Sequence, residues 1–261
     1  MSLRGDGKIA VVTGASSGIG QASAIELAKA GFTLAIGARR TERLEATAAE
    51  IERVSGVAPF VHSLDVTSVE SSQTFVDAVM DHFGGVHVLL NNAGLALGST
   101  YIENADSEDD WQTMMDTNVI GLLRMTRLLI PKLLESGGGH IVNLGSIAGR
   151  DAYAGGAGYC ASKFAVRAIT DTLRQELLGK PIHVTTIDPG MVETEFSIVR
   201  NYGDEVKAKD IYAGMEPLTA ADIADLVVFS VTRPWHVNID AIIVKPLAQA
   251  GAGKVARRQP E

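Results

Sequence analysis

The alternation of short apolar runs with longer amphipathic segments constrains this fold more than any other feature of the sequence. Apolar runs of strand length occupy residues 8–13, 32–38, 57–65, 86–91, 140–145, 183–188 and 239–244. Segments with helical periodicity occupy residues 19–30, 41–54, 69–83, 107–136, 156–178 and 220–231. Strands that alternate with helices form right-handed crossover units, which bury a parallel sheet on both faces. The pattern predicts an α/β fold: a single doubly wound Rossmann-type domain over residues 1–261, with a seven-stranded parallel sheet and helices on both faces.

Three local features refine this prediction. Ser107 begins a Ser-Glu-Asp-Asp segment, which predicts a capping box at the start of the helix over residues 107–136. Residues 189–217 show no regular pattern, and we expect them to form an irregular loop beside the substrate. Residues 249–261 include a basic stretch and are expected to form a flexible C-terminal tail.

Charge and cysteine content exclude several classes of function. The formal net charge is −8, so no broad basic field is available to bind nucleic acid. The single cysteine, Cys160, excludes an intrachain disulfide and a cysteine-based metal site, and it fits a reducing compartment. The six histidines show no metal-ligand spacing, no apolar run approaches the roughly 20 residues of a membrane span, and the first residues lack a signal-peptide core. We therefore expect a cytoplasmic protein that binds a small molecule and has no metal, membrane or nucleic-acid partner.

A glycine-rich turn, Thr13-Gly14-Ala15-Ser16-Ser17-Gly18-Ile19-Gly20, follows the first predicted strand and opens the first predicted helix. Glycines let the backbone turn tightly and approach a pyrophosphate, while the start of the next helix offers unpaired N–H groups. The Gly-Lys-Ser/Thr element of a nucleotide-hydrolysing loop is missing. The residues expected to bind a dinucleotide are thus Gly14, Ser16, Ser17, Gly18, Ile19 and Gly20.

The ends of the next strands indicate which dinucleotide binds. Arg39 and Arg40 follow the second strand, where NAD-binding proteins carry an acid for the ribose 2′-hydroxyl. A guanidinium binds phosphate in a bidentate manner, so the two arginines favour NADP(H). Asp65 and Val66 end the third strand and are expected beside the adenine. The segment Asn91-Asn92-Ala93-Gly94 ends the fourth strand, where the cofactor must cross the sheet.

One tyrosine has the neighbour that hydride-transfer chemistry needs. Lys163 lies at i+4 from Tyr159, on the same face of a predicted helix, and its charge is expected to lower the pKa of the phenol. The other four tyrosines have Ala, Ala, Val and Glu at i+4. Tyr159 is therefore the candidate acid/base for a hydroxyl or carbonyl substrate.

Two further polar residues complete the candidate catalytic set. Ser146 ends the fifth predicted strand, where its hydroxyl could polarise a substrate oxygen. Asn118 lies in the middle of the helix over residues 107–136, although asparagine is a poor helix former. It is either a surface residue or a residue that kinks the helix and holds a water for proton relay to Lys163.

These motifs resemble the short-chain dehydrogenase/reductase family along nearly the whole chain. The glycine turn, the Asn-Asn-Ala-Gly element, the Tyr159–Lys163 pair and the Pro189-Gly190 turn occur in the family's order. The resemblance implies a homotetramer and a tetrad in which Ser146 orients substrate, Tyr159 transfers the proton, Lys163 binds the ribose, and Asn118 relays protons. It also implies nicotinamide contacts from Pro189, Gly190, Val192 and Thr194.

Shorter segments suggest a substrate class. Residues 92–98, 153–156, 194–200 and 236–239 are similar to the NADP-dependent 3-hydroxy acid dehydrogenases, which oxidise serine, allo-threonine and related small acids. A carboxylate substrate would need a cation, and Arg150 and Arg200 are the candidates.

Two alternatives remain open at this point. One keeps the chemistry and changes the substrate to another ketone or aldehyde, or to a secondary-metabolite carbonyl, as in clavulanic-acid-type dehydrogenases. The other is a non-catalytic dinucleotide-binding protein, which is disfavoured because both Tyr159 and Lys163 are present.

Overall fold

Seven parallel strands form the central sheet of the computed structural model, which describes residues 4–258. The strands are β1 (Ile9–Thr13), β2 (Thr33–Ala38), β3 (Phe60–Ser63), β4 (Val88–Asn91), β5 (Gly139–Leu144), β6 (Ile182–Pro189) and β7 (Ala241–Val244). Their order is β3-β2-β1-β4-β5-β6-β7, so the direction of winding reverses between β1 and β4. In such sheets ligands bind beyond the carboxyl ends of the strands at this reversal. The predicted fold class is confirmed.

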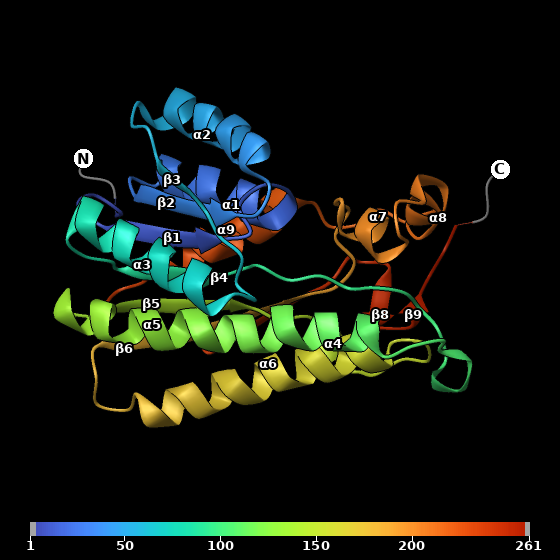
Figure 1. The fold of residues 1–261 in the computed structure, drawn as a ribbon. Coiled ribbons are helices and arrows are strands. Elements are labelled where there is room, and N and C mark those ends of the chain that lie inside the picture. The colour runs from blue at the N-terminus through green and yellow to red at the C-terminus, as the bar shows by residue number, and fades with distance from the viewer. Residues whose placement is uncertain (1–3, 259–261) are drawn as a thin grey trace.

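Helices cover both faces of the sheet (Figure 1). One face carries α1 (Gly18–Lys29), α2 (Thr41–Ser55) and α9 (Ala220–Val231), and the other carries α3 (Val69–Phe83), α5 (Leu122–Glu135) and α6 (Ala157–Glu176). Adjacent strand residues supply opposite cores: Val12 packs with α1 and α9, while Val11 packs with α3 and α5. This follows from the two-residue period of a strand.

The helix predicted over residues 107–136 is interrupted. It consists of α4 (Asp109–Met115), a π-helical turn (Asp116–Gly121) and α5. The predicted capping box at Ser107 is wrong, because the Asp110 carboxylate accepts a hydrogen bond from Tyr202 instead of turning back to the helix. A capping box does form at the start of α9, between Thr219 and Asp222.

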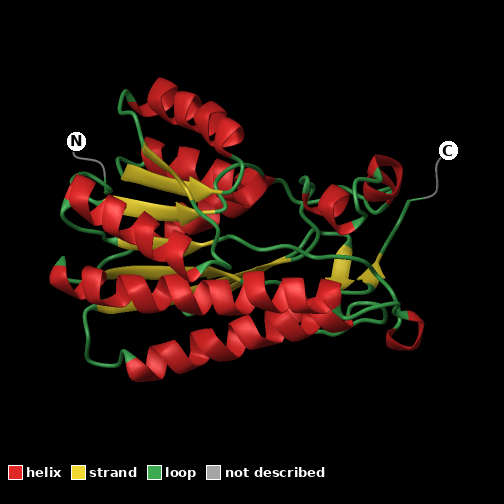
Figure 2. Ribbon diagram, viewed as in Figure 1, coloured by secondary structure: helices red, strands yellow, loops and turns green. Residues whose placement is uncertain are grey.

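Two segments expected to be irregular or flexible are ordered. The loop over residues 189–217 contains α7 (Phe196–Arg200) and α8 (Glu205–Asp210), and short 3-10 helices cover Ile102–Asn104 and Ile147–Gly149. Figure 2 shows the strands pointing toward the end of the molecule where α7 and α8 lie.

The C-terminal segment packs against the same end. Its two strands, β8 (Gln249–Gly251) and β9 (Lys254–Val255), pair antiparallel. The Gln249 side chain is buried and accepts from the Met191 N–H, and Arg257 donates to backbone carbonyls of Ile211 and Ala213. The prediction of a flexible tail is therefore wrong for residues 249–258, which pack on the domain. Residues 259–261 lie outside the described residues.

None of the helices within residues 4–258 combines the length and hydropathy needed to span a bilayer.

Candidate active site

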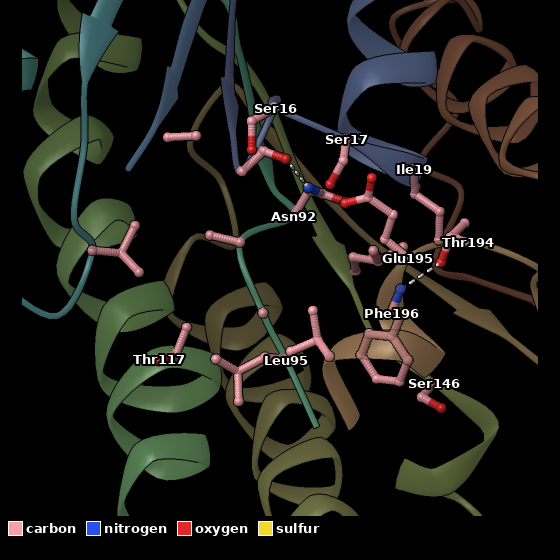
Figure 3. Close-up of a pocket in the computed structure, with 18 of the residues that line it drawn as sticks. Ser16, Ser17, Ile19, Asn92, Leu95, Thr117, Ser146, Thr194, Glu195 and Phe196 are labelled. Carbon is pink, nitrogen blue, oxygen red and sulfur yellow. Dashed lines mark hydrogen bonds between the residues drawn. The ribbon is translucent and has the colours of Figure 1, made fainter. Parts of the chain in front are cut away.

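A cavity of about 390 Å³ opens at the carboxyl ends of the strands, between the glycine turn, the end of β4, α6 and the segment around α7 (Figure 3). Most residues that the sequence analysis assigned to cofactor or catalysis line this cavity. They are Gly14, Ser16, Ser17, Gly18, Ile19, Arg39, Arg40, Asp65, Val66, Ala93, Gly94, Ser146, Tyr159, Lys163, Pro189, Gly190, Val192 and Thr194. Segments separated by more than 100 residues thus meet in one place.

The glycine turn has a backbone that only glycine adopts without strain. Gly14 and Gly18 have φ angles of 67° and 55°, in the left-handed region. Ser17 precedes α1 without a side-chain hydrogen bond to the first N–H groups of the helix. Open N–H groups at the start of a helix of this length fit a pyrophosphate.

Gly20 faces protein instead of the cavity. A Cβ at Gly20 would lie 2.3 Å from Asn92 Nδ2 and 2.4 Å from the Gly14 carbonyl oxygen. The glycine therefore allows α1 to pack closely on the loops. Its predicted contact with the cofactor, which its backbone would make, stays a prediction.

Asn91, which the sequence placed in the segment that the cofactor crosses, does not line the cavity, whereas its neighbour Asn92 does. The buried Asn91 side chain donates to Thr126 Oγ1 and Asn143 Oδ1, so it holds strands and helix together and does not line the cavity. Asn92, in contrast, lines the cavity and donates to the carbonyl oxygens of Thr13 and Gly14. Successive strand side chains point to opposite faces, which separates the two neighbours.

Arginines and serines gather at one end of the cavity. The Arg40 Nη2 donates to Ser17 Oγ at 2.6 Å and to Ser16 Oγ at 3.2 Å. The Glu195 carboxylate accepts from Arg40 Nη1 at 3.1 Å and from Arg43 Nη1 at 2.5 Å, and the bond from Arg43 lowers the pKa of Glu195. The sequence analysis missed Glu195 and Arg43, because no spacing rule links residues more than 150 positions apart.

Asp65 lines the cavity near the adenine position that the sequence suggested. Its Oδ1 accepts from the Thr67 N–H at 2.9 Å and from Thr67 Oγ1 at 2.7 Å. The carboxylate therefore shapes the turn after β3 while keeping its second oxygen for other contacts.

The candidate acid/base lies on the first turn of α6. Lys163 Nζ lies 5.9 Å from the centroid of the Tyr159 ring and donates to the Leu144 carbonyl oxygen at 2.8 Å. Burial lowers the pKa of Lys163 to about 8. Burial also raises the pKa of Tyr159, and a hydrogen bond with Ser146 opposes this increase. The expected lowering of the phenol pKa by Lys163 is thus wrong for the protein alone, since desolvation dominates.

Asn118 lies in the π-helical turn and is 2 % exposed. Its Nδ2 donates to the Leu95 carbonyl oxygen at 2.8 Å and to Ser162 Oγ at 3.0 Å, while its Oδ1 accepts from the Leu95 N–H at 2.8 Å. The surface alternative is wrong. Its side chain joins the loop after β4 to α6 and does not line the cavity.

The two candidate substrate arginines have different surroundings. Arg150 Nε donates to Asp188 Oδ2 at 2.5 Å, and Asp188 is 2 % exposed. Arg150 thus neutralises a buried carboxylate, and we no longer assign it to substrate.

The guanidinium carbon of Arg200 lies 6.0 Å from the Tyr159 ring centroid and 5.5 Å from that of Tyr153. Arg200 also donates to Gly98 O and Ser99 Oγ, at 3.1 and 2.8 Å. These bonds fix the cation beside the phenol, although Arg200 is not among the residues that line the cavity.

Comparisons with known proteins agree with this geometry. Residues 8–204 match the short chain dehydrogenase family. An NADP-dependent 3-hydroxy acid dehydrogenase of Schizosaccharomyces pombe is 43% identical over 255 residues, covering 97% of this chain and 98% of that protein. Sulfoacetaldehyde reductase 2 of Chromohalobacter salexigens is 42% identical over 243 residues, covering 93% and 95%.

A solved structure, the closed form of serine dehydrogenase complexed with NADP+, superposes with a TM-score of 0.88 at 38% identity, covering 96% of this chain and all of that one. The sequence match, the shared fold and the placement of Ser146, Tyr159 and Lys163 beyond the end of β5, on the wall of the same cavity, lead to one conclusion: the chain belongs to the short-chain dehydrogenase family.

Proposed function

We propose that this protein is an NADP(H)-dependent oxidoreductase of small 3-hydroxy acids, of the serine, allo-threonine or 3-hydroxypropionate type, and of the matching 3-oxo acids. The observation that carries the substrate class is the position of Arg200, a fixed cation beside the candidate acid/base. The relatives named above as NADP-dependent and as acting on hydroxy acids support both parts.

The cofactor would lie across the carboxyl ends of β1 and β4. Gly14, Gly18 and the start of α1 would hold the pyrophosphate, and Arg40 with Ser16 and Ser17 would hold the 2′-phosphate. The nicotinamide supplies or accepts the hydride when it is bound, and Pro189 through Thr194 would contact it.

Residues of the protein transfer the proton to and from the substrate oxygen. In reduction the Tyr159 hydroxyl donates its proton to the carbonyl oxygen, and in oxidation the phenolate takes it back. The raised pKa of Tyr159 keeps the phenol protonated at neutral pH, in the form that donates the proton in reduction. Ser146, which already hydrogen-bonds Tyr159, would orient the substrate oxygen. The Lys163 ammonium would bind the ribose and stabilise the phenolate, and Asn118 would relay protons to it.

Arg200 would select for an anion. A guanidinium has five N–H donors, and the described bonds to Gly98 and Ser99 use two of them. The remaining donors can bind a carboxylate in a bidentate manner. A three-carbon acid is short enough to place its C3 oxygen at Tyr159 while its carboxylate contacts Arg200.

A substrate panel with variants tests this function. NADPH and NADP+ turnover would be measured with serine, allo-threonine, 3-hydroxypropionate, the matching 3-oxo acids and neutral ketones. Tyr159→Phe should lower kcat by about 10²- to 10⁴-fold for every substrate. Arg200→Ala should raise KM for acids by about 10²-fold while sparing neutral substrates. Arg53→Ala, which removes an exposed arginine of α2 that pairs with Glu50 away from the cavity, is the control. Brisk reduction of neutral ketones without turnover of any acid would refute the substrate class.

A second anionic substrate deserves its own arm of the panel, because a relative 42% identical is named sulfoacetaldehyde reductase. A sulfonate would use the same arginine. Preference for sulfoacetaldehyde over 3-oxo acids would move the assignment to short sulfonated aldehydes while leaving the role of Arg200 intact.

Two broader proposals accompany the enzymatic one. We propose a homotetramer, supported by two apolar surfaces discussed below. We also propose that the enzyme works in the cytoplasm, because its one cysteine, Cys160, is free and buried beside the catalytic tyrosine and suits a reducing compartment.

A further inference from the structure

Glu195 lies at a junction between two regions that are far apart in the sequence. Its carboxylate bridges Arg40, at the start of α2, and Arg43, within α2. Arg40 also contacts Ser16 and Ser17 of the glycine turn. Figure 3 shows Glu195 and Phe196 across from Ser17 and Ile19 on the cavity wall. One acidic residue thus connects the segment around α7 to the arginine end of the cavity.

The helix that follows Glu195 leads to the substrate end. α7 has only five residues and ends at Arg200, beside Tyr159. The Phe196 ring, at the start of α7, lies 5.6 Å from the Tyr159 ring centroid. Because α7 is so short, a shift at Glu195 would also reach Arg200, whose side chain is held in addition by Gly98 and Ser99.

Arg40 is the cation through which a cofactor phosphate would act on Glu195. Arg40 and Glu195 both line the cavity, whereas Arg43 does not. A 2′-phosphate beside Ser16 and Ser17 would bind Arg40 as well, and so would restrict further a side chain that already donates to Ser16, Ser17 and Glu195. A guanidinium can hold a phosphate on one edge and a carboxylate on the other, so the bridge to Glu195 persists.

We propose that Glu195 is a specificity-determining positioning residue: through Arg40 and Arg43 it makes the seating of α7, and therefore of Arg200, depend on the 2′-phosphate of the cofactor. The inference rests on the proposed use of NADP(H) and of Arg200. NADH carries a hydroxyl in place of that phosphate, so it leaves Arg40 with only its bonds to Ser16, Ser17 and Glu195, and α7 less firmly held.

The expected effect is modest, because these ion pairs are about half exposed to solvent. Pairs of this kind change equilibria by small factors that salt reduces further. We expect Glu195→Gln to raise KM for the acidic substrate about threefold to tenfold with NADPH, with kcat changed less than twofold.

Hydrogen–deuterium exchange tests the coupling without any substrate. Amide exchange over residues 193–204 would be followed by mass spectrometry in the full-length protein, with saturating NADPH or saturating NADH. The variants are Glu195→Gln and a control, Glu50→Gln, which removes an exposed Glu–Arg pair from α2 away from the cavity. In the wild type and in the control, NADPH should slow exchange over residues 193–204 more than NADH does. In Glu195→Gln the two cofactors should give the same exchange.

Three outcomes would overturn the proposal. They are equal protection by both cofactors in the wild type, NADPH-specific protection that survives Glu195→Gln, and faster exchange over residues 193–204 with NADPH, which would mean that phosphate displaces Glu195 from Arg40. A wrong substrate class would instead appear as missing turnover of acids in the wild type, with the exchange results unaffected.

Discussion

Arg150 and Arg200 show how two residues of the same type can have unrelated roles. Arg150 is a counter-ion: it faces Asp188, which also accepts a hydrogen bond from Thr186 Oγ1. Asp188 packs directly against Gly145, the residue that follows β5. A Cβ at Gly145 would come within 1.9 Å of the Asp188 Oδ1. Removing the Arg150 partner would leave a buried charge unpaired, which costs far more than an exposed one. Arg200 instead satisfies part of its donor set with a loop and keeps the rest beside Tyr159.

The pKa of Lys163 leads to a prediction about how activity depends on pH. Burial lowers its pKa to about 8, while the pKa of Tyr159 is raised, so the lysine is the group that titrates first as pH rises. The ammonium is present below pH 8 and lost above it. We expect kcat/KM for NADPH, which reports the free enzyme, to be level up to about pH 7.5 and to fall as pH passes 8. A profile that stays level to pH 9.5 would contradict this assignment.

At the scale of elements, the π-helical turn between α4 and α5 places a polar side chain where an uninterrupted helix would not. π-turns are uncommon and recur at functional sites. Here the turn directs Asn118 toward Leu95 and Ser162, so a single side chain fixes the loop after β4 against α6. The loop contributes Ala93 and Gly94 to the cavity. Its geometry therefore depends on a helix that is distant in sequence.

Asn118→Ala should destabilise the protein as well as slow it. The substitution leaves the half-buried N–H and C=O of Leu95 without the partner they have in Asn118, and an unpaired group of this kind costs up to about 1–3 kcal/mol. We expect the apparent Tm to fall by about 4–10 °C, measured by differential scanning calorimetry. Gln112→Ala, which removes an exposed hydrogen bond to Asp116 on the same helical run, should change it by no more than about 2 °C. Equal Tm values for the two variants would argue against the role of Asn118 in holding the loop after β4 against α6.

At the scale of the whole molecule, large apolar side chains stay exposed at several places within residues 4–258, and we define two groups of them as apolar surfaces. The first consists of Ile120, Leu123 and Phe164, which are 43%, 39% and 41% exposed on the outer side of the π-turn, α5 and α6. The second consists of Phe229, Trp235, Ile243 and Leu247, on and beside α9 and β7. A tetramer with three two-fold axes needs at least two different isologous contacts. Two separate apolar surfaces match that requirement.

A charge placed on the first apolar surface should split the proposed tetramer into dimers. We expect the wild type to have the mass of four chains by native mass spectrometry and Phe164→Glu to have the mass of two, because a carboxylate in an apolar contact is left unpaired. Val57→Glu, on an exposed site in neither surface, should leave four chains together. A monomeric wild type, or a Phe164→Glu variant that remains tetrameric, would rule out this interface.

The sequence by itself determined the central sheet, the main helices and most of the residues that meet at the cavity, because these depend on local signals. The period of the apolar side chains distinguishes strands from helices, and glycines allow the tight turn at residues 14–20. The i+4 spacing places Tyr159 beside Lys163 on one face of a helix. Helix bounds such as 69–83 and 220–231 were predicted to the residue.

Only the tertiary structure decided which partner each polar group takes. The Asp110 carboxylate accepts a hydrogen bond from Tyr202 and forms no capping box. Asn91 points into the core, while Asn92 faces the cavity. Arg150 binds Asp188, whereas Arg200 lies beside Tyr159. Glu195 meets Arg40 across 155 positions of sequence. Hydrogen bonds and ion pairs act over a few ångströms of space, and crossovers bring distant residues to that range without leaving a periodic trace in the sequence.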